Sequence, residues 1–521
     1  MAVPDDIKAV KRPKNTVVKP YGVCKDKYSV VQRIGCKNKG NGRRWPVDGP
    51  TIGHIIDHVY VALDGSTPYA ETGKSDPART TRVPETPNAS VCGVDLKNWA
   101  NISLCQKLFA ELYSELLTFY SAKDAQKIAC IVILRVCNKG ICDYELGQAY
   151  KESFLTELMP GVALSKNTVS KFLGDLGRAC SKIFLFMRAR TGRIDVNSPV
   201  LIDGTLKSND SKVNSLSDFS RKAKTKGSRD ISVLYAFDLE KDEPICSQCF
   251  PGNMLDLTAY GHFIETNQIK SGIIVADKGF PASAIKKQLA AYPGLHYLNP
   301  IKRNSKAISE LDLAEYDCIL KKYPGIQGKK AATADKSKFY YSFRDIEQAH
   351  LEERSFLEAA LKKDDYDDQK FKTMQATRFG TIVLESDIDM TLEDAYKAYS
   401  QRWEIELVMR FYKQACGFDE TRVHDDYSVI GSEFCNFLAS VLTYRLIHAF
   451  DRAGLLEKWT YKQVMKTLER AKKVRVDGKN WQLVGQLKSY YGILEKLGLM
   501  DQNDMNDAVD YSATDQEVES V

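Results

Sequence analysis

At 521 residues, with 43% hydrophobic and 27% charged residues, the chain is long enough to bury several cores, and ordinary domain sizes predict about two to four domains. Its net charge of +6 is too small to indicate a nucleic-acid partner by itself. The first 20 residues contain five basic side chains but no apolar run of the signal-peptide kind, and no later apolar run is long enough to cross a bilayer. These features exclude secreted and membrane-spanning proteins and predict a soluble cytoplasmic protein.

Thirteen cysteines are scattered along the chain, an odd number without the spacing of a disulfide framework. In a chain without a secretory signal they indicate reduced thiols. Cys246 and Cys249 form a C-x-x-C pair that zinc could use, but zinc needs four ligands and no second pair follows at zinc-ribbon spacing. We therefore favour buried thiols over a metal site at this pair.

Residues 1–98 are predicted to form a small, basic, β-rich module. Residues 28–35 and 54–63 have the β-branched composition of strands. The basic, glycine-rich residues 36–44 are expected to separate the two strands as a loop.

Two histidines in this module, His54 and His58, lie four residues apart. Together with Cys24 and Cys36 they form an alternative metal site, because imidazoles and thiolates are the usual zinc ligands. The β-branched residues around the histidines favour a strand instead, which is the interpretation we adopt.

Residues 99–196 are predicted to be helical, because apolar residues recur at intervals of three and four. Within them, residues 164–176 have a serine near their start, Ser165, that suits a helix N-cap, and apolar residues on one side. The other side presents Lys166, Asn167 and Lys171, as in the second helix of a helix-turn-helix that lies in a DNA groove. Helical bundles that bind no DNA show the same pattern, so both interpretations stay open.

Residues 197–302 change to alternating strand and helix patterns. Strands are predicted at residues 200–203, 231–240, 244–250, 272–277 and 295–301. Continuous apolar runs of this kind are typical of strands that are covered on both faces. The pattern therefore predicts an α/β domain with a mixed sheet.

This alternation stops at residues 303–378, where a lysine-rich stretch is followed by an acidic, helix-like stretch. We interpret this segment as an insertion. The α/β domain is expected to resume over residues 379–455, with a strand at 379–386, a helix from about Thr391 and a helix over 430–450.

The chain is predicted to end with a helical region at residues 456–500 and an acidic, disordered tail at residues 501–521. The tail contains seven acidic residues and no lysine or arginine. The rest of the chain is therefore more basic than the total charge implies.

Two aspartates close short apolar runs in the predicted α/β domain. Asp203 ends the run VLID, Asp277 ends the run IIVAD, and turn-forming residues follow each of them. A carboxylate at the end of a buried strand faces the crevice where open α/β sheets bind ligands. Either aspartate alone would be interpreted as a turn or helix-cap residue, but two in one domain favour a site.

A polar stripe follows on a predicted helix. At roughly 100° per residue, Tyr399, Arg402, Glu406 and Lys413 fall on one helix face, within about 60° of arc. The stripe is roughly 21 Å long. Because the residues around the rest of this helix are largely apolar, the stripe is expected to face a ligand and not solvent. Cations that flank a carboxylate along such a stripe suit a phosphate backbone.

The segment YSQRWEIELVMRFYK, residues 399–413, resembles the Tyr-x2-Arg-x3-Glu-x6-Lys signature of a family of insertion-sequence DDE transposases, at all four positions. LIDGT at 201–205 is similar to the family's first-aspartate motif. VADKGF at 275–280 is similar to its second, with a lysine where arginine is more usual. The resemblance covers roughly residues 200–450 and includes PGNMLD at 251–256.

The resemblance implies a ribonuclease H-like catalytic core with an insertion, often β-rich, between the second aspartate and the glutamate. Asp277 and Glu406 are 129 residues apart, which leaves room for such an insertion. The acidic helical part of the insertion departs from a purely β-stranded one.

The resemblance also implies the site. Asp203, Asp277 and Glu406 would be catalytic carboxylates that hold two Mg²⁺ or Mn²⁺ ions, since oxygen ligands select these metals. Such a pair of ions suits phosphoryl transfer. Tyr399, Arg402 and Lys413 would bind phosphates near the cleaved DNA end.

The implied function is that of a bacterial, nucleoid-associated transposase that cuts transposon ends and joins them to target DNA. Its partners would be the terminal inverted repeats, the target DNA and a second copy of the chain in the DNA complex. Residues 220–229, SRKAKTKGSR, include Arg221, Lys222, Lys224 and Lys226. This basic run is either a further DNA contact or a solvated loop.

Two alternative functions remain at this point. A related nuclease would hydrolyse DNA without joining strands. An inactive transposase descendant would bind DNA without cutting it, although the intact set of carboxylates argues against that alternative.

Overall fold

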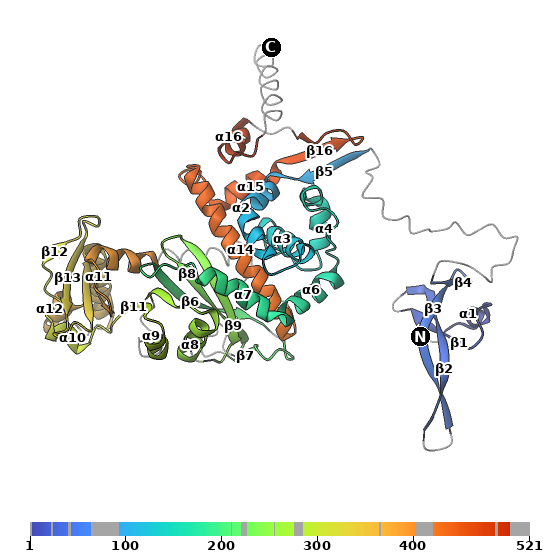
Figure 1. The fold of residues 1–521 in the computed structure, drawn as a ribbon, viewed down its shortest axis with the longest axis horizontal. Coiled ribbons are helices and arrows are strands. Elements are labelled where there is room, and N and C mark those ends of the chain that lie inside the picture. Colours follow the sequence, from blue (N-terminus) through green and yellow to red (C-terminus); the bar gives the residue numbers. More distant parts are fainter. Residues whose placement is uncertain are drawn as a thin grey trace, which may run out of the picture. The chain divides into compact units, whose positions relative to one another are not determined.

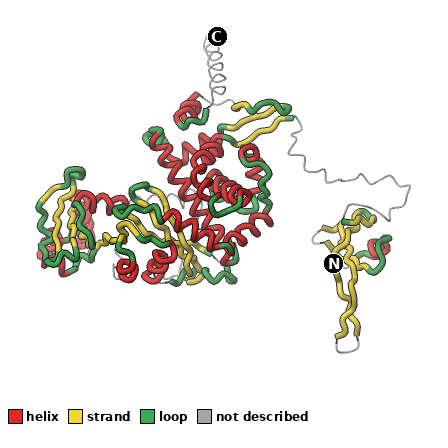
Figure 2. Tube along the Cα trace, in the orientation of Figure 1, coloured by secondary structure: helices red, strands yellow, loops and turns green. Residues whose placement is uncertain are grey.

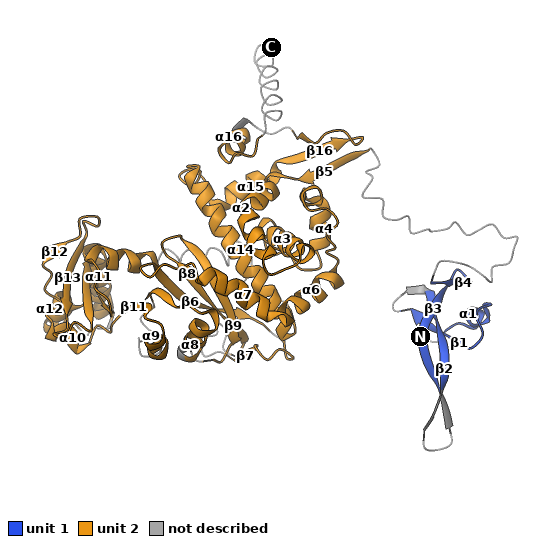
Figure 3. Cartoon of the chain, viewed as in Figure 1, with its two compact units in different colours: residues 1–88 blue, residues 89–521 orange. Residues whose placement is uncertain are grey.

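The computed structural model describes residues 3–21, 24–39, 43–63, 93–209, 211–219, 227–254, 256–275, 285–363, 366–402, 420–421, 423–484 and 488–500. The chain forms two compact units, Met1–Asn88 and Ala89–Val521, which Figure 3 distinguishes by colour. Each unit is described separately below.

Unit 1 is a four-stranded antiparallel sheet with one short helix. Its elements are α1 (Asp5–Ala9), β1 (Thr16–Tyr21), β2 (Cys24–Lys39), β3 (Arg43–Ile56) and β4 (Val59–Ala62), with the strands in sheet order β1-β2-β3-β4. A small core of Ile7, Val18, Val30, Ile55 and Tyr60 holds α1 against the sheet.

The sequence prediction for this unit is right about strands and wrong about where they end. The predicted loop at residues 36–44 belongs largely to β2 and β3, which pair from Lys27 opposite Ile56 to Lys39 opposite Arg43. The predicted strand at 54–63 is broken by a turn in which Asp57 and His58 have φ of 49° and 61°. Strand composition continues across this turn, so composition alone did not reveal it.

Unit 2 begins with one strand and a group of helices, and the helices lie within residues 99–196, as predicted. These are β5 (Val94–Asn98), α2 (Ala100–Leu117), α3 (Ala122–Cys137), α4 (Leu146–Glu152), α5 (Leu155–Leu158), α6 (Lys166–Arg178) and α7 (Cys180–Thr191). Ser165 caps α6 by accepting a hydrogen bond from the backbone N–H of Thr168, as the sequence predicted.

A mixed sheet of ten strands follows, with helices beside it (Figure 2). Its strands are β6 (Pro199–Ser208), β7 (Asp218–Phe219), β8 (Arg229–Asp238), β9 (Glu243–Pro251), β10 (Ser271–Val275), β11 (Gly294–Pro300), β12 (Cys318–Ile319), β13 (Ile326–Ala332), β14 (Phe339–Asp345) and β15 (Thr381–Ser386). The order is β12-β13-β14-β15-β11-β10-β6-β8-β7, and β9 pairs with β8. Strand β10 is parallel to β6 and β11, and the other pairings are antiparallel. The predicted mixed α/β class is confirmed.

Helices α8 (Asp256–Asn267) and α9 (Lys286–Ala291) lie along the chain between β9 and β11. The segment 303–378 contains α10 (Lys306–Glu310), α11 (Ile346–Lys363) and α12 (Asp368–Thr377), so its acidic helical stretch is confirmed. Strands β13 and β14 of this segment join the main sheet through β15, and they lie at one end of the unit in Figure 1. The segment therefore extends the sheet instead of forming a sheet of its own.

Helix α14 (Asp426–Arg452) is buried along most of its length and crosses α6 at very short range. A methyl group added to Gly177 of α6 would lie 1.8 Å from the carbonyl oxygen of Tyr427, and one added to Gly431 of α14 would lie 2.1 Å from that of Leu173. The two backbones can approach this closely only because these residues lack side chains.

We expect Gly177→Ala to destabilise the protein by about 1–3 kcal/mol or more, because α6 must move away from α14 to admit the methyl group. Urea unfolding followed by circular dichroism measures the change. Gly492→Ala is the matched control: this exposed helical glycine has open space around its missing Cβ, and alanine there should be neutral or slightly stabilising. Equal stability of the two variants would contradict the crossing.

The C-terminal region contradicts the prediction of a wholly helical end. After α15 (Tyr461–Arg470) come β16 (Lys472–Val476), β17 (Gln482–Leu483) and α16 (Lys488–Lys496). Strand β16 pairs antiparallel with β5, with Val474 opposite Leu96. The partner strand lies almost 380 residues away in the sequence, so no local pattern reveals the pairing.

Cysteine thiols whose side chains are described are all free. Cys246 and Cys249 lie on β9, and burial raises the pKa of both thiols, which agrees with the prediction of buried thiols.

His54 packs edge-on against Tyr21 with ring centroids 5.0 Å apart. Among the described residues, no group of three potential ligands could hold a metal.

Across the described residues, no helix combines the length and the hydropathy needed to cross a membrane.

Candidate active site

Strand β6 carries Asp203 in the middle of the mixed sheet, between antiparallel β8 and parallel β10. Val200, Leu201 and Ile202 before it are buried, and Asp203 is the first partly exposed residue after this apolar run. Its Oδ1 accepts a hydrogen bond of 2.8 Å from the backbone N–H of Gly204. The strand thus presents this carboxylate where burial ends.

Two tyrosines that the sequence did not single out lie close to this position. Tyr260 of α8 donates a 3.0 Å hydrogen bond to the carbonyl oxygen of Ile202, which ties α8 to the strand next to Asp203. Tyr444 of α14 is buried. Burial, with smaller effects from the charges of Asp242 and Asp203, raises the pKa of its phenol. Helix α14 therefore passes within electrostatic reach of Asp203.

Strand β10 leads toward the second predicted aspartate. Its last described residue, Val275, lies opposite Leu201 of β6 in a parallel pairing. Leu201 precedes Asp203 by two residues, and Val275 precedes Asp277 by two residues. Asp277 itself lies outside the described residues.

The helix that begins after Thr391 carries the first half of the predicted stripe. Thr391 caps it by accepting from the N–H of Asp394, and the helix is described as far as residue 402. The guanidinium carbon of Arg402, which is buried, lies 5.4 Å from the ring centroid of Tyr399, so these two predicted site residues are in contact. Glu406 and Lys413 lie outside the described residues.

Hydrogen bonds fix both sides of the segment that contains Glu406 to the two ends of β6. Before it, the Gln401 side chain donates a 3.0 Å hydrogen bond to the carbonyl oxygen of Leu239. The backbone N–H of Leu239 in turn donates a 3.0 Å hydrogen bond to the carbonyl oxygen of Pro199, at the start of β6. After it, the backbone N–H of Thr421 donates a 3.0 Å hydrogen bond to the carbonyl oxygen of Ser208, at the end of β6. Asp203 lies between these two anchor points.

A buried ion pair secures the second anchor. Nζ of Lys207 on β6 lies 2.5 Å from Oε2 of Glu433 on α14, and the two side chains are 1% and 2% exposed. Oε1 of the same glutamate accepts from the hydroxyl of Thr421 at 3.2 Å and from the amide of Asn436 at 3.0 Å. Sequence reasoning missed this pair, although a lone glutamate in the apolar run VIGSEFCNFLASV was a usable signal.

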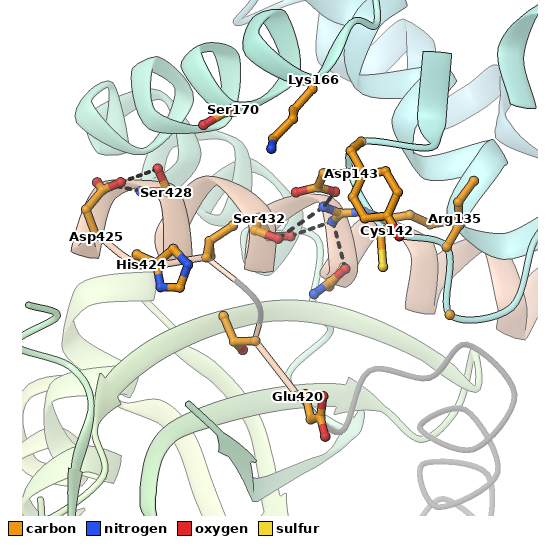
Figure 4. Close-up of a pocket in the computed structure, with 16 residues that line it drawn as sticks. Arg135, Cys142, Asp143, Lys166, Ser170, Glu420, His424, Asp425, Ser428 and Ser432 are labelled. Carbon is orange, nitrogen blue, oxygen red and sulfur yellow. Dashed lines mark hydrogen bonds and ion pairs between the residues drawn. The ribbon is translucent and has the colours of Figure 1, made fainter. Parts of the chain in front are cut away.

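The polar side of α6 is exposed as predicted, at Lys166, Asn167 and Lys171. Lys171 forms an ion pair with Asp175 one turn along the helix. Lys166 and Ser170 face a cavity of about 490 Å³ (Figure 4).

Residues before α14 and one residue of α3 also line this cavity. Glu420 and Thr421, beside the end of β6, line it together with His424, and the buried Arg135, which pairs with Asp143 at 2.9 Å, closes one wall (Figure 4). The predicted DNA-binding face of α6 and residues Glu420 and Thr421, which pair with the end of β6, thus border one cavity. The four basic residues predicted at 221–226 lie outside the described residues.

Comparison with known proteins indicates the class. Residues 197–429, less than half of the chain, match the model of the transposase DDE domain family. This match supports an enzyme of the DNA transposase class.

The other comparisons add little. No curated protein sequence matches the chain. A cryo-EM structure of the piggyBac transposase synaptic complex with hairpin DNA is similar with a TM-score of 0.37 and 14% identity, over 72% of this chain and 80% of that chain. At this level of similarity, no residue role is transferred from that structure.

Proposed function

We propose that the chain cleaves the ends of a transposon and joins them to target DNA, with Asp203, Asp277 and Glu406 as its catalytic carboxylates. The observation that carries the proposal is the parallel pairing of Leu201 with Val275. Both aspartates follow this pair by two residues, on strands that are neighbours at about 4.8 Å. If the pairing continues, the two carboxylates leave the same edge of the sheet side by side.

The two anchors around Glu406 support its assignment as the third carboxylate. The segment that contains Glu406 starts and ends beside the two ends of β6, the strand that carries Asp203.

The donor set fits Mg²⁺ or Mn²⁺, because all three side chains offer only carboxylate oxygens. When bound, two such ions supply activation of the attacking oxygen and charge stabilisation for the leaving oxygen. In this proposal Asp203, Asp277 and Glu406 would together hold the ions. Tyr260 and the Lys207–Glu433 pair hold the strand that presents Asp203.

The arrangement of strands supports a ribonuclease H-like core, formed by residues 197–302 and 379–455 and interrupted by the insertion at 303–378. DNA is the proposed substrate, since residues 197–429 match the transposase DDE domain. Arg402, Tyr399 and Lys413 contact its phosphates, and the exposed side of α6 contacts it across the shared cavity. We further propose that two copies of the chain act together on the two transposon ends.

A strand-transfer assay tests the proposed function. The purified chain is incubated with Mg²⁺, labelled duplexes that carry the inverted repeats flanking its reading frame, and a supercoiled plasmid. We expect cut ends and plasmid-joined product, both lost when EDTA replaces the metal. Cleavage without joined product would favour a nuclease, and binding without cleavage would favour an inactive descendant.

A further inference from the structure

We infer that Tyr444 of α14 is a positioning residue of the candidate active site. Its hydroxyl donates a hydrogen bond to the Asp203 carboxylate, directly or through one water, when that carboxylate holds a metal ion. The inference rests on the proposed function, which makes Asp203 a metal ligand. Tyr444 belongs to none of the sequence motifs described above, and it lies outside residues 197–429, which match the transposase DDE domain.

The register of the sheet decides which way Asp203 points. Asp203 of β6 lies directly opposite Tyr235 of β8, and two residues earlier Leu201 lies opposite Phe237. Opposed residues of antiparallel strands share a face of the sheet, and so do residues two apart on one strand. Lys207, four residues after Asp203, therefore belongs to this face as well.

Helix α14 covers this face and contacts it on both sides of Asp203. Nζ of Lys207 lies 2.5 Å from Oε2 of Glu433, and the ring centroid of Tyr444 lies 6.0 Å from that of Phe237, opposite Leu201. Glu433 and Tyr444 are eleven residues apart, about three helical turns, so they project from the same side of α14. Tyr444 is therefore directed at the part of the sheet that carries Asp203.

The hydroxyl of Tyr444 has no structural use among the described residues. The side chain is 3% exposed, and no described residue forms a hydrogen bond with this hydroxyl. A buried hydroxyl without a partner lowers stability, whereas phenylalanine would fill the same space without that cost. A partner that is present only when the site is loaded explains why the hydroxyl is there. Burial, followed by the charges of Asp242 and Asp203, raises the pKa of the phenol, so it remains a hydrogen-bond donor.

Asp203 lies where this face of the sheet opens. Leu201 and Thr205, its neighbours on the same face of β6, are buried, whereas Asp203 is partly exposed. A carboxylate at such an opening can take an ion from solvent. Groups that hydrogen-bond to a ligating carboxylate orient it and strengthen metal binding. Asp242, the other charge that acts on Tyr444, belongs to no proposed set of metal ligands, so metal affinity separates the two possible acceptors.

The test removes one hydroxyl at a time from the full-length chain. Tyr444→Phe is compared with Tyr120→Phe, a matched control. Tyr120 is also buried, its hydroxyl also lacks a described partner, and its ring lies 6.0 Å from that of Phe434 on α14. Asp203→Ala is the reference for loss of the ion site. Electron paramagnetic resonance measures Mn²⁺ binding, and urea unfolding in EDTA measures stability without metal.

We expect Tyr444→Phe to raise the dissociation constant for Mn²⁺ about tenfold or more, the usual effect of removing a partner of a ligating side chain. Tyr120→Phe should stay within about twofold of the parent chain. In EDTA, both phenylalanine variants should unfold at a urea concentration equal to or above that of the parent, because each loses an unpaired hydroxyl. A weaker ion site in a protein of undiminished stability separates positioning from packing.

Unchanged Mn²⁺ affinity in Tyr444→Phe, with binding lost in Asp203→Ala, would overturn the inference and leave the proposed function standing. Equal Mn²⁺ binding by the parent and Asp203→Ala would refute the metal assignment of Asp203 and the inference with it. A lower urea midpoint for Tyr444→Phe than for Tyr120→Phe in EDTA would also overturn the inference, because the hydroxyl would then have a partner without metal.

Discussion

Asp203→Ala is expected to abolish metal-dependent nicking of DNA, with a loss of roughly 10³-fold or more, while DNA binding in EDTA changes by less than about threefold. Asp203 is one of the residues that would hold the ions, and its removal would take away negative charge that keeps them where the phosphate reacts. The side chain is partly exposed and has a local hydrogen bond to Gly204, so its loss should leave the fold intact. Gel assays of nicking at several Mg²⁺ concentrations measure the effect.

Asp195→Ala is the matched control for this variant. Asp195 is exposed, precedes β6, and its Oδ1 likewise accepts a local backbone hydrogen bond, from Asn197. We expect its nicking rate to equal that of the parent chain. Retention of more than a tenth of the parent activity in Asp203→Ala would refute the assignment of this residue, whatever the effect of the control.

The second large effect concerns stability. Glu433→Gln is expected to destabilise unit 2 by roughly 3–5 kcal/mol, because it leaves the ammonium of Lys207 buried without an opposite charge. The double variant Lys207→Met with Glu433→Gln should recover most of this loss, since no buried charge then remains. Chemical unfolding followed by tryptophan fluorescence compares the three proteins.

An exposed pair provides the contrast. Lys171 and Asp175 on α6 are 78% and 47% exposed, so Asp175→Asn should leave the stability of unit 2 essentially unchanged. If the single and double variants at Lys207 and Glu433 were equally unstable, the two charges would not be coupled. The loss would then come from the hydrogen bonds that Glu433 accepts from Thr421 and Asn436.

Local patterns were sufficient for most of the helices and strands. The apolar runs at 200–203 and 272–275 became β6 and β10, and the serine before residue 166 became the cap of α6. These predictions succeeded because an apolar run or a cap is decided by residues within a few positions of each other. The contact between Tyr399 and Arg402 depends on helix spacing in the same way, whereas Glu406 and Lys413 lie outside the described residues.

Several features depend on partners that the sequence does not place. Lys207 and Glu433 are 226 residues apart in the sequence, so each looks like an isolated charge in an apolar run. Glycines 177 and 431 are informative only once α6 and α14 are known to cross.

The sequence by itself indicated the class of enzyme through the resemblance of its motifs, and it determined the mixed α/β character of unit 2, because spacing along a strand or helix fixes which side chains share a face. The residues for catalysis remain a proposal. Only the tertiary structure decided that β5 pairs with β16, that β13 and β14 continue the main sheet, and that a buried ion pair holds the end of β6. The physical reason is that strand edges and buried charges are satisfied by whichever distant segment docks against them, and this choice is made by the packing of the whole unit.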